Sequence, residues 1–236
     1  MAPLTRGLGL LGSAVSYALA STRLATPQRL SCPTPCAGWD LELLLHHVSD
    51  SVGVLHEAIT AGYVGTGPAP GDGGPGPDPV AVLHLRAARL LAACAPGGPS
   101  GHLVAIGDRE LAARMVAAAG AIEITVHGWD IAVACGSHRP VPPGLAAVLL
   151  PIVPLFITPG TRAGLFADPV PVPGRACPGD QLVAFLGRQP RIPGFGRVEA
   201  GARDRIVEEV HLCGVHACPD TDPEICGRAG MTRPGG

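Results

Sequence analysis

The chain has 236 residues and a formal net charge of −2, and 47% of its residues are hydrophobic. This length and composition allow one or two domains with a substantial core, and the near-neutral charge without basic runs excludes an extended nucleic-acid-binding surface. Beyond its N-terminal segment the chain has no run of about 18 unbroken apolar residues, so we expect no membrane span.

Apolar residues recur at helical spacing in the N-terminal segment, from Leu4 through Leu11 to Ala18. The same segment has one Arg, an apolar run and an Ala-Leu-Ala end, which are also features of a signal peptide. The helical pattern continues to Leu24. We therefore favour a first helix over about residues 4–25.

Three further helices are predicted. The second covers about residues 39–62, where Leu41, Leu45 and Ile59 lie on one apolar stripe. The Gly- and Pro-rich loop 65–79 separates it from a third helix over about 79–95, and a fourth is predicted over about 108–136. Four helices with long connections predict an all-α fold, a four-helix bundle with long crossover loops.

The C-terminal part of the chain is expected to be less regular. Short helices are predicted near 143–156 and at 180–187, separated by Pro-rich sequence. We therefore divide the chain into a bundle (1–137), a helical and Pro-rich segment that packs on it (138–195) and an irregular tail (196–236). The tail contains His211, Cys213, His216 and Cys218, but their spacing matches no closed tetrahedral zinc site, so we predict a disordered extension.

Ionisable residues gather on one face of the predicted fourth helix, which is otherwise rich in Ala and Val. At about 100° per residue, Glu123, His127 and Asp130 fall on one stripe with small residues. Burying a carboxylate and an imidazole without partners is costly. The i, i+4 spacing of Glu123 and His127 suits a shared metal ion, although a buried Glu–His hydrogen bond would leave the same pattern.

A third metal ligand is expected on the predicted second helix, which contains two adjacent histidines. His46 falls on the polar side of the helical wheel, whereas His47 lies at the edge of the apolar stripe. His47, Glu123 and His127 would leave an open position for water or substrate, as in catalytic zinc sites. Asp130 lies one turn past His127, and we expect it to support His127 or the helix packing rather than to bind the metal.

Other residues are weaker candidates for the site. Arg109 and Arg114 are candidates for contacting an anionic substrate, although Arg side chains on a helix are more often simply solvated. Trp39 and Trp129 are expected to be core or cap residues rather than substrate platforms. The pattern identifies no catalytic residue.

Three segments together resemble one known family. They read "TPCAGWDLELLLHHV" (34–48), "IEITVHGWDIAVACG" (122–136) and "GLFADPVPVP" with "GDQLVAFLGRQP" (within 164–190). They are similar to the actinobacterial metal-binding family related to mycothiol-dependent maleylpyruvate isomerase, in the DinB-like superfamily. The resemblance implies a DinB-like four-helix bundle that holds a divalent metal, usually zinc, through His, Glu and His. The matching positions are His47, Glu123 and His127, which the helical wheel also favours.

The resemblance also implies a reaction, because members of the superfamily are thought to place a low-molecular-weight thiol on the metal. We therefore expect a cytoplasmic enzyme, a monomer or homodimer, that uses a divalent metal and mycothiol for isomerisation or S-transfer on a small electrophilic substrate. Two alternatives stay open. One is a metal-dependent hydrolase or lyase, and the other is a non-catalytic bundle that binds a metal or a small ligand.

Overall fold

The computed structural model of the chain describes residues 7–65, 78–95 and 102–191. The tail that the sequence predicts to be irregular, 196–236, lies outside these residues. The described chain divides into two compact units. The first contains the residues up to Arg139 except Pro35–Ala37, and the second contains Pro35–Ala37 and the residues from Pro140 onward.

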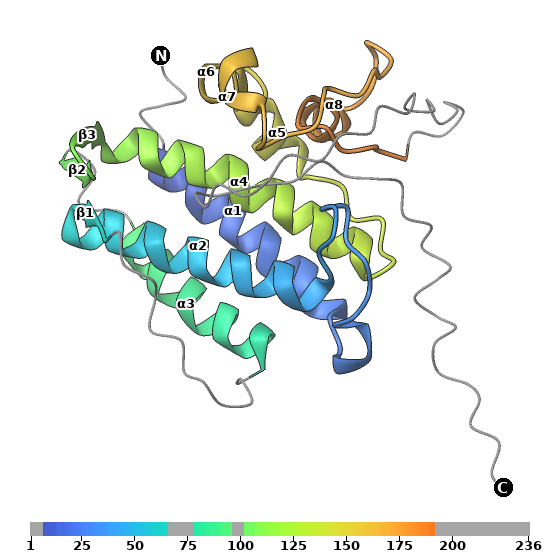
Figure 1. Cartoon of the computed structure of the whole chain (residues 1–236), viewed down its shortest axis with the longest axis horizontal. Coiled ribbons are helices and arrows are strands. Elements are labelled where there is room, and N and C mark those ends of the chain that lie inside the picture. The colour runs from blue at the N-terminus through green and yellow to red at the C-terminus, as the bar shows by residue number, and fades with distance from the viewer. Residues whose placement is uncertain (1–6, 66–77, 96–101, 192–236) are drawn as a thin grey trace, which may run out of the picture. The chain divides into compact units, whose positions relative to one another are not determined.

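Four long helices build the first unit and run alongside one another (Figure 1). They are α1 (Gly7–Ser21), α2 (Leu41–Ala61), α3 (Pro79–Ala93) and α4 (Ala113–Ala134). The largest interfaces join α1 to α4 and α2 to α3, and α2 also packs on α4. The mainly helical fold that the sequence predicts is therefore confirmed.

Local sequence sets both ends of α2. The Asp40 carboxylate accepts a hydrogen bond from the backbone N–H of Leu43, which caps the N-terminus of the helix. At the other end Gly62 has φ 74°, a left-handed conformation that glycine adopts without steric penalty. Both ends lie within two residues of the positions predicted from the sequence.

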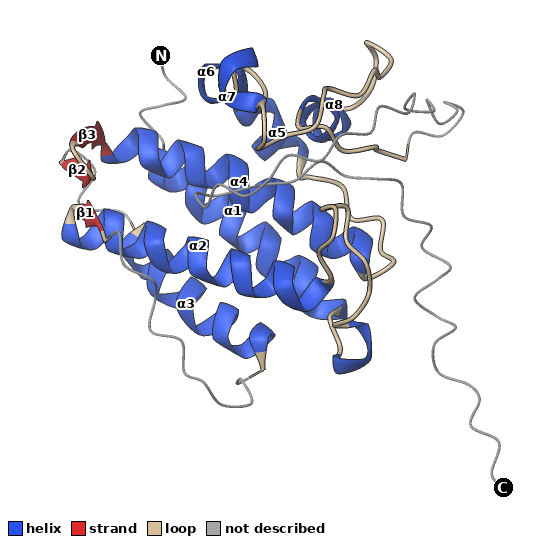
Figure 2. Cartoon of the chain, viewed as in Figure 1, coloured by secondary structure: helices blue, strands red, loops and turns tan. Residues whose placement is uncertain are grey.

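A small three-stranded sheet at one end of the bundle is the part of this unit that the sequence analysis missed (Figure 2). The strands are β1 (Tyr63–Val64), β2 (Leu103–Ile106) and β3 (Arg109–Ala112). β2 is the central strand, parallel to β1 and antiparallel to β3. The turn between β2 and β3 contains Gly107 with φ 59°.

The sheet corrects the predicted start of the fourth helix. The prediction of helix from about residue 108 was wrong, because Arg109–Ala112 forms β3 and α4 begins only at Ala113. The buried side chain of Val104 on β2 packs against Ala58 and Ala113. Strand pairing thus buries apolar surface at the bundle end, and this tertiary contact outweighs the helical pattern of the local sequence.

Glycines allow neighbouring helices to come close to α4. A Cβ atom added to Gly128 would lie 3.0 Å from Ala18 Cα and 3.0 Å from the Tyr17 ring, both on α1. A Cβ on Gly120 would lie 2.5 Å from Leu55 Cδ2 on α2. Helices α1 and α2 therefore occupy the space that a side chain larger than glycine would need at positions 128 and 120 of α4.

The described part of the second unit contains four short helices, α5 (Pro143–Leu149), α6 (Val153–Phe156), α7 (Pro159–Arg162) and α8 (Pro178–Phe185). The helix predicted near 143–156 is split into α5 and α6, because Pro151 between them has no N–H to continue a helix. Helix α8 confirms the helix predicted at 180–187. Arg162 donates to the carbonyl oxygens of Ala167 and Phe185 and ties α7 to the end of α8.

Helix α4 is the described helix that, by length and composition alone, could cross a membrane. Most of the apolar stretch of α4 is buried inside the protein, including Ile124 and Ile131. Burial on nearly all sides is typical of the core helix of a globular protein.

Candidate metal centre

The structure brings together the three residues that the sequence analysis proposes as metal ligands. His47 lies on α2, and Glu123 and His127 lie one turn apart on α4. One potential ligand atom from each of the three side chains lies within 4.8 Å of the other two. The packing of α2 on α4 and the i, i+4 spacing along α4 together produce this arrangement.

His47 presents a nitrogen atom that suits coordination to a cation. Its Nε2 atom is buried and has no hydrogen-bond partner in the described part of the chain, although it lies 3.4 Å from Glu123 Oε1. A buried nitrogen without a hydrogen bond is unfavourable, and coordination to a metal would satisfy it. Two imidazoles and one carboxylate are also a common ligand set of catalytic zinc sites. The three residues therefore fit a divalent metal.

The group lies at the boundary between the protein interior and solvent. His127 is completely buried, whereas the side chains of His47 and Glu123 are 18% and 27% exposed. The rings of His47 and His127 meet edge to face, with 5.0 Å between centroids. The site is thus anchored on α4, and parts of the His47 and Glu123 side chains reach solvent.

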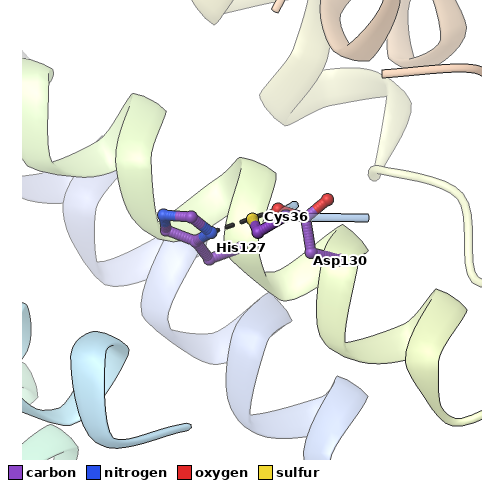
Figure 3. Close-up of side chains that lie close together, drawn as sticks. All are labelled: Cys36, His127 and Asp130. Carbon is purple, nitrogen blue, oxygen red and sulfur yellow. Dashed lines mark hydrogen bonds and ion pairs between the residues drawn. The ribbon is translucent and has the colours of Figure 1, made fainter. Parts of the chain in front are cut away.

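Asp130 holds the ring of His127 from the side of its Nδ1 atom (Figure 3). The two atoms joined by the hydrogen bond, His127 Nδ1 and Asp130 Oδ2, are 3.1 Å apart, and both side chains are fully buried. Because a carboxylate only accepts, Nδ1 carries the proton, and in the neutral imidazole the lone pair is then on Nε2, the form that binds a metal. This contact agrees with the supporting role that the sequence analysis proposes for Asp130.

Glu123 is held in its ionised form. Burial raises its pKa, but the imidazoles of His47 and His127 and the hydroxyl of Ser51 together hold that pKa below its ordinary value. Ser51 donates a hydrogen bond to Glu123 Oε1 over 2.5 Å. An ionised carboxylate is the form that coordinates a metal.

Residues 13–132, which run from within α1 to near the end of α4 and contain all three candidate ligands, match the mycothiol maleylpyruvate isomerase N-terminal domain. The chain belongs to this family. Two relatives, uncharacterised proteins from two strains of Mycobacterium tuberculosis, are each 32% identical over 169 residues, which cover 69% of this chain and 87% of the relative. No solved structure matches the chain. The family confirms the resemblance seen in the sequence and agrees with a DinB-like helix bundle.

Beside the ligands, the sequence analysis missed Ser51 and considered Trp39 mainly as a core or cap residue. The Trp39 ring lies edge to face with the His47 ring, 4.9 Å between centroids, so this half-buried tryptophan borders the site rather than serving only as a core or cap residue. Ser51 lies one turn after His47 on α2. Its i, i+4 spacing from His47 is the signal that could have identified it.

The structure does not bring the two candidate arginines to the ligands. Arg109 is exposed on β3, and Arg114 is exposed in the first turn of α4. Arg114 precedes Glu123 by more than two helical turns, about 13 Å along the axis. A contact between these arginines and an anionic substrate stays a prediction.

Two cysteines at helix ends in this unit are expected to be unreactive. Burial raises the thiol pKa of Cys94 and of Cys135 to about 11, so both stay protonated near neutral pH, and the thiol is a poor nucleophile. At about pH 8, iodoacetamide should modify exposed Cys177 at least about tenfold faster than Cys135. Peptide mapping by mass spectrometry measures both rates. The difference should vanish in urea, and equal rates in the folded protein would contradict the prediction.

Proposed function

We propose that the protein is a metal-dependent enzyme that uses mycothiol for isomerisation of, or S-transfer to, a small electrophilic substrate. The observation that carries the proposal is the cluster of His47, Glu123 and His127 in a member of a family linked to mycothiol. Two His and one Glu suit zinc. When bound, such a metal lowers the pKa of a coordinated thiol and so provides a thiolate at neutral pH.

Different residues of the chain would bind this metal and orient its ligands. His47, Glu123 and His127 hold it, and Asp130 keeps His127 in the tautomer with its lone pair on Nε2. Three protein ligands leave at least one position for the thiol. The side chains of His47 and Glu123 are partly exposed, which supports approach of a small molecule from their side of the site.

We place the enzyme in the cytoplasm, because low-molecular-weight thiols are kept reduced there. Its partner is a small-molecule substrate rather than a nucleic acid or a membrane, and it acts as a monomer or homodimer. The near-neutral charge of the chain and the burial of α4 support this setting.

A two-component assay tests the proposed reaction. Maleylpyruvate tests isomerisation and chlorodinitrobenzene tests S-transfer, each with and without mycothiol, on zinc-loaded and on chelated protein. We expect turnover only when zinc and mycothiol are both present. The rate should fall as the pH drops, because protons compete both for the thiolate and for the imidazole ligands.

The other outcomes of this assay separate the alternatives. Full turnover in thiol-free buffer, for instance of an ester, would contradict the thiol mechanism and favour a metal-dependent hydrolase or lyase. Tight zinc binding without any turnover would favour a non-catalytic binding bundle.

A further inference from the structure

We infer that Ser51 is a positioning residue for Glu123, and that its hydroxyl group sets the orientation of the carboxylate for metal binding. The inference rests on the proposed metal site. It concerns a residue that neither the ligand pattern in the sequence nor the family match points to.

The contact joins the two helices that build the site. Ser51 Oγ on α2 donates to Glu123 Oε1 on α4 over 2.5 Å, and His47 Nε2 lies 3.4 Å from the same oxygen. His47 and Ser51 are one turn apart on the same face of α2. One carboxylate oxygen of Glu123 is therefore placed between a hydroxyl group and an imidazole from the neighbouring helix.

Glu123 needs such a contact more than the other two ligands do. His127 is fully buried and held by Asp130, and the His47 ring contacts the rings of Trp39 and His127 edge to face. Glu123 has the most exposed side chain of the three, 27%, so packing fixes less of it. The Ser51 hydroxyl supplies the hydrogen bond that holds the carboxylate in one rotamer.

The zinc affinity of the full chain tests whether Ser51 positions the Glu123 carboxylate. Partners that hydrogen-bond to a metal ligand contribute about 10–100-fold to affinity, so Ser51→Ala should weaken zinc binding by about that factor. Competition with a chromophoric chelator gives the dissociation constant. Ser51→Thr keeps the hydroxyl group and should restore most of the affinity.

Ser49→Ala is the matched control. Ser49 lies two residues earlier on α2, is buried, and its hydroxyl has no hydrogen-bond partner among the described residues. The same chemical change there should leave zinc affinity unchanged. Melting of the metal-free proteins shows whether any variant is unfolded.

Cobalt substitution separates positioning from a general effect on stability. The visible absorption of bound Co²⁺ reports ligand geometry, and it should change in Ser51→Ala while Ser49→Ala matches the wild type. Wild-type affinity in Ser51→Ala, or weaker binding with an unchanged cobalt spectrum, would overturn the inference and leave the metal site standing. A wild-type protein that binds neither zinc nor cobalt would overturn both the inference and the proposed function.

Discussion

The substitution His47→Ala should remove bound zinc, whereas His46→Ala should leave it in place. His47 directs a buried Nε2 atom toward Glu123, 3.4 Å from its Oε1, while the adjacent His46 is exposed on α2. Losing one of three protein ligands costs more than losing a supporting contact, so we expect affinity to fall by more than about 100-fold. Elemental analysis of dialysed protein gives the zinc content directly.

The two histidines form a close internal comparison, since the same change is made at neighbouring positions of one helix. Glu123→Ala and His127→Ala should behave like His47→Ala. Retention of zinc by His47→Ala together with its loss from His46→Ala would show that the metal lies on the other side of α2 and that the ligand assignment is wrong.

The second large effect concerns the stability of the bundle. Gly128→Val should lower the free energy of unfolding by about 3 kcal/mol and the melting temperature by about 10 °C. A Cβ at this position already meets the backbone of Ala18 and the Tyr17 ring at 3.0 Å. A branched side chain would therefore push α1 away from α4, the pair with the largest helix interface. Thermal unfolding of the metal-free protein followed by circular dichroism measures the change.

Gly53→Ala is the control for helical glycine. Gly53 lies within α2, and a Cβ there would come no closer than 3.8 Å, to the Arg86 side chain. Because Ala is a better helix former than Gly, this change should raise stability by up to about 1 kcal/mol. A loss of stability in Gly53→Ala, or wild-type stability in Gly128→Val, would show that close helix approach is not what selects glycine at position 128.

Much of the bundle is determined locally and is therefore readable from the sequence. The apolar stripe predicts α2 because it repeats within the turns of one helix, and the Asp40 cap seen in the structure is just as local. The same period of about 100° per residue places Glu123 and His127 on one face of α4 and separates inward His47 from outward His46. The candidate ligand set could thus be proposed before α2 and α4 were known to pack on each other.

Contacts between distant segments were decided only by the tertiary structure. Arg109–Ala112 has a sequence compatible with helix, and it forms β3 because pairing with β2 buries Val104 at the end of the bundle. The hydrogen bond from Ser51 to Glu123 depends on the relative height of α2 and α4, which no periodicity within either helix specifies. The contact of Trp39 with His47 likewise depends on how the loop before α2 folds back onto the helix. Local patterns select helix faces, and packing selects which atoms on those faces meet.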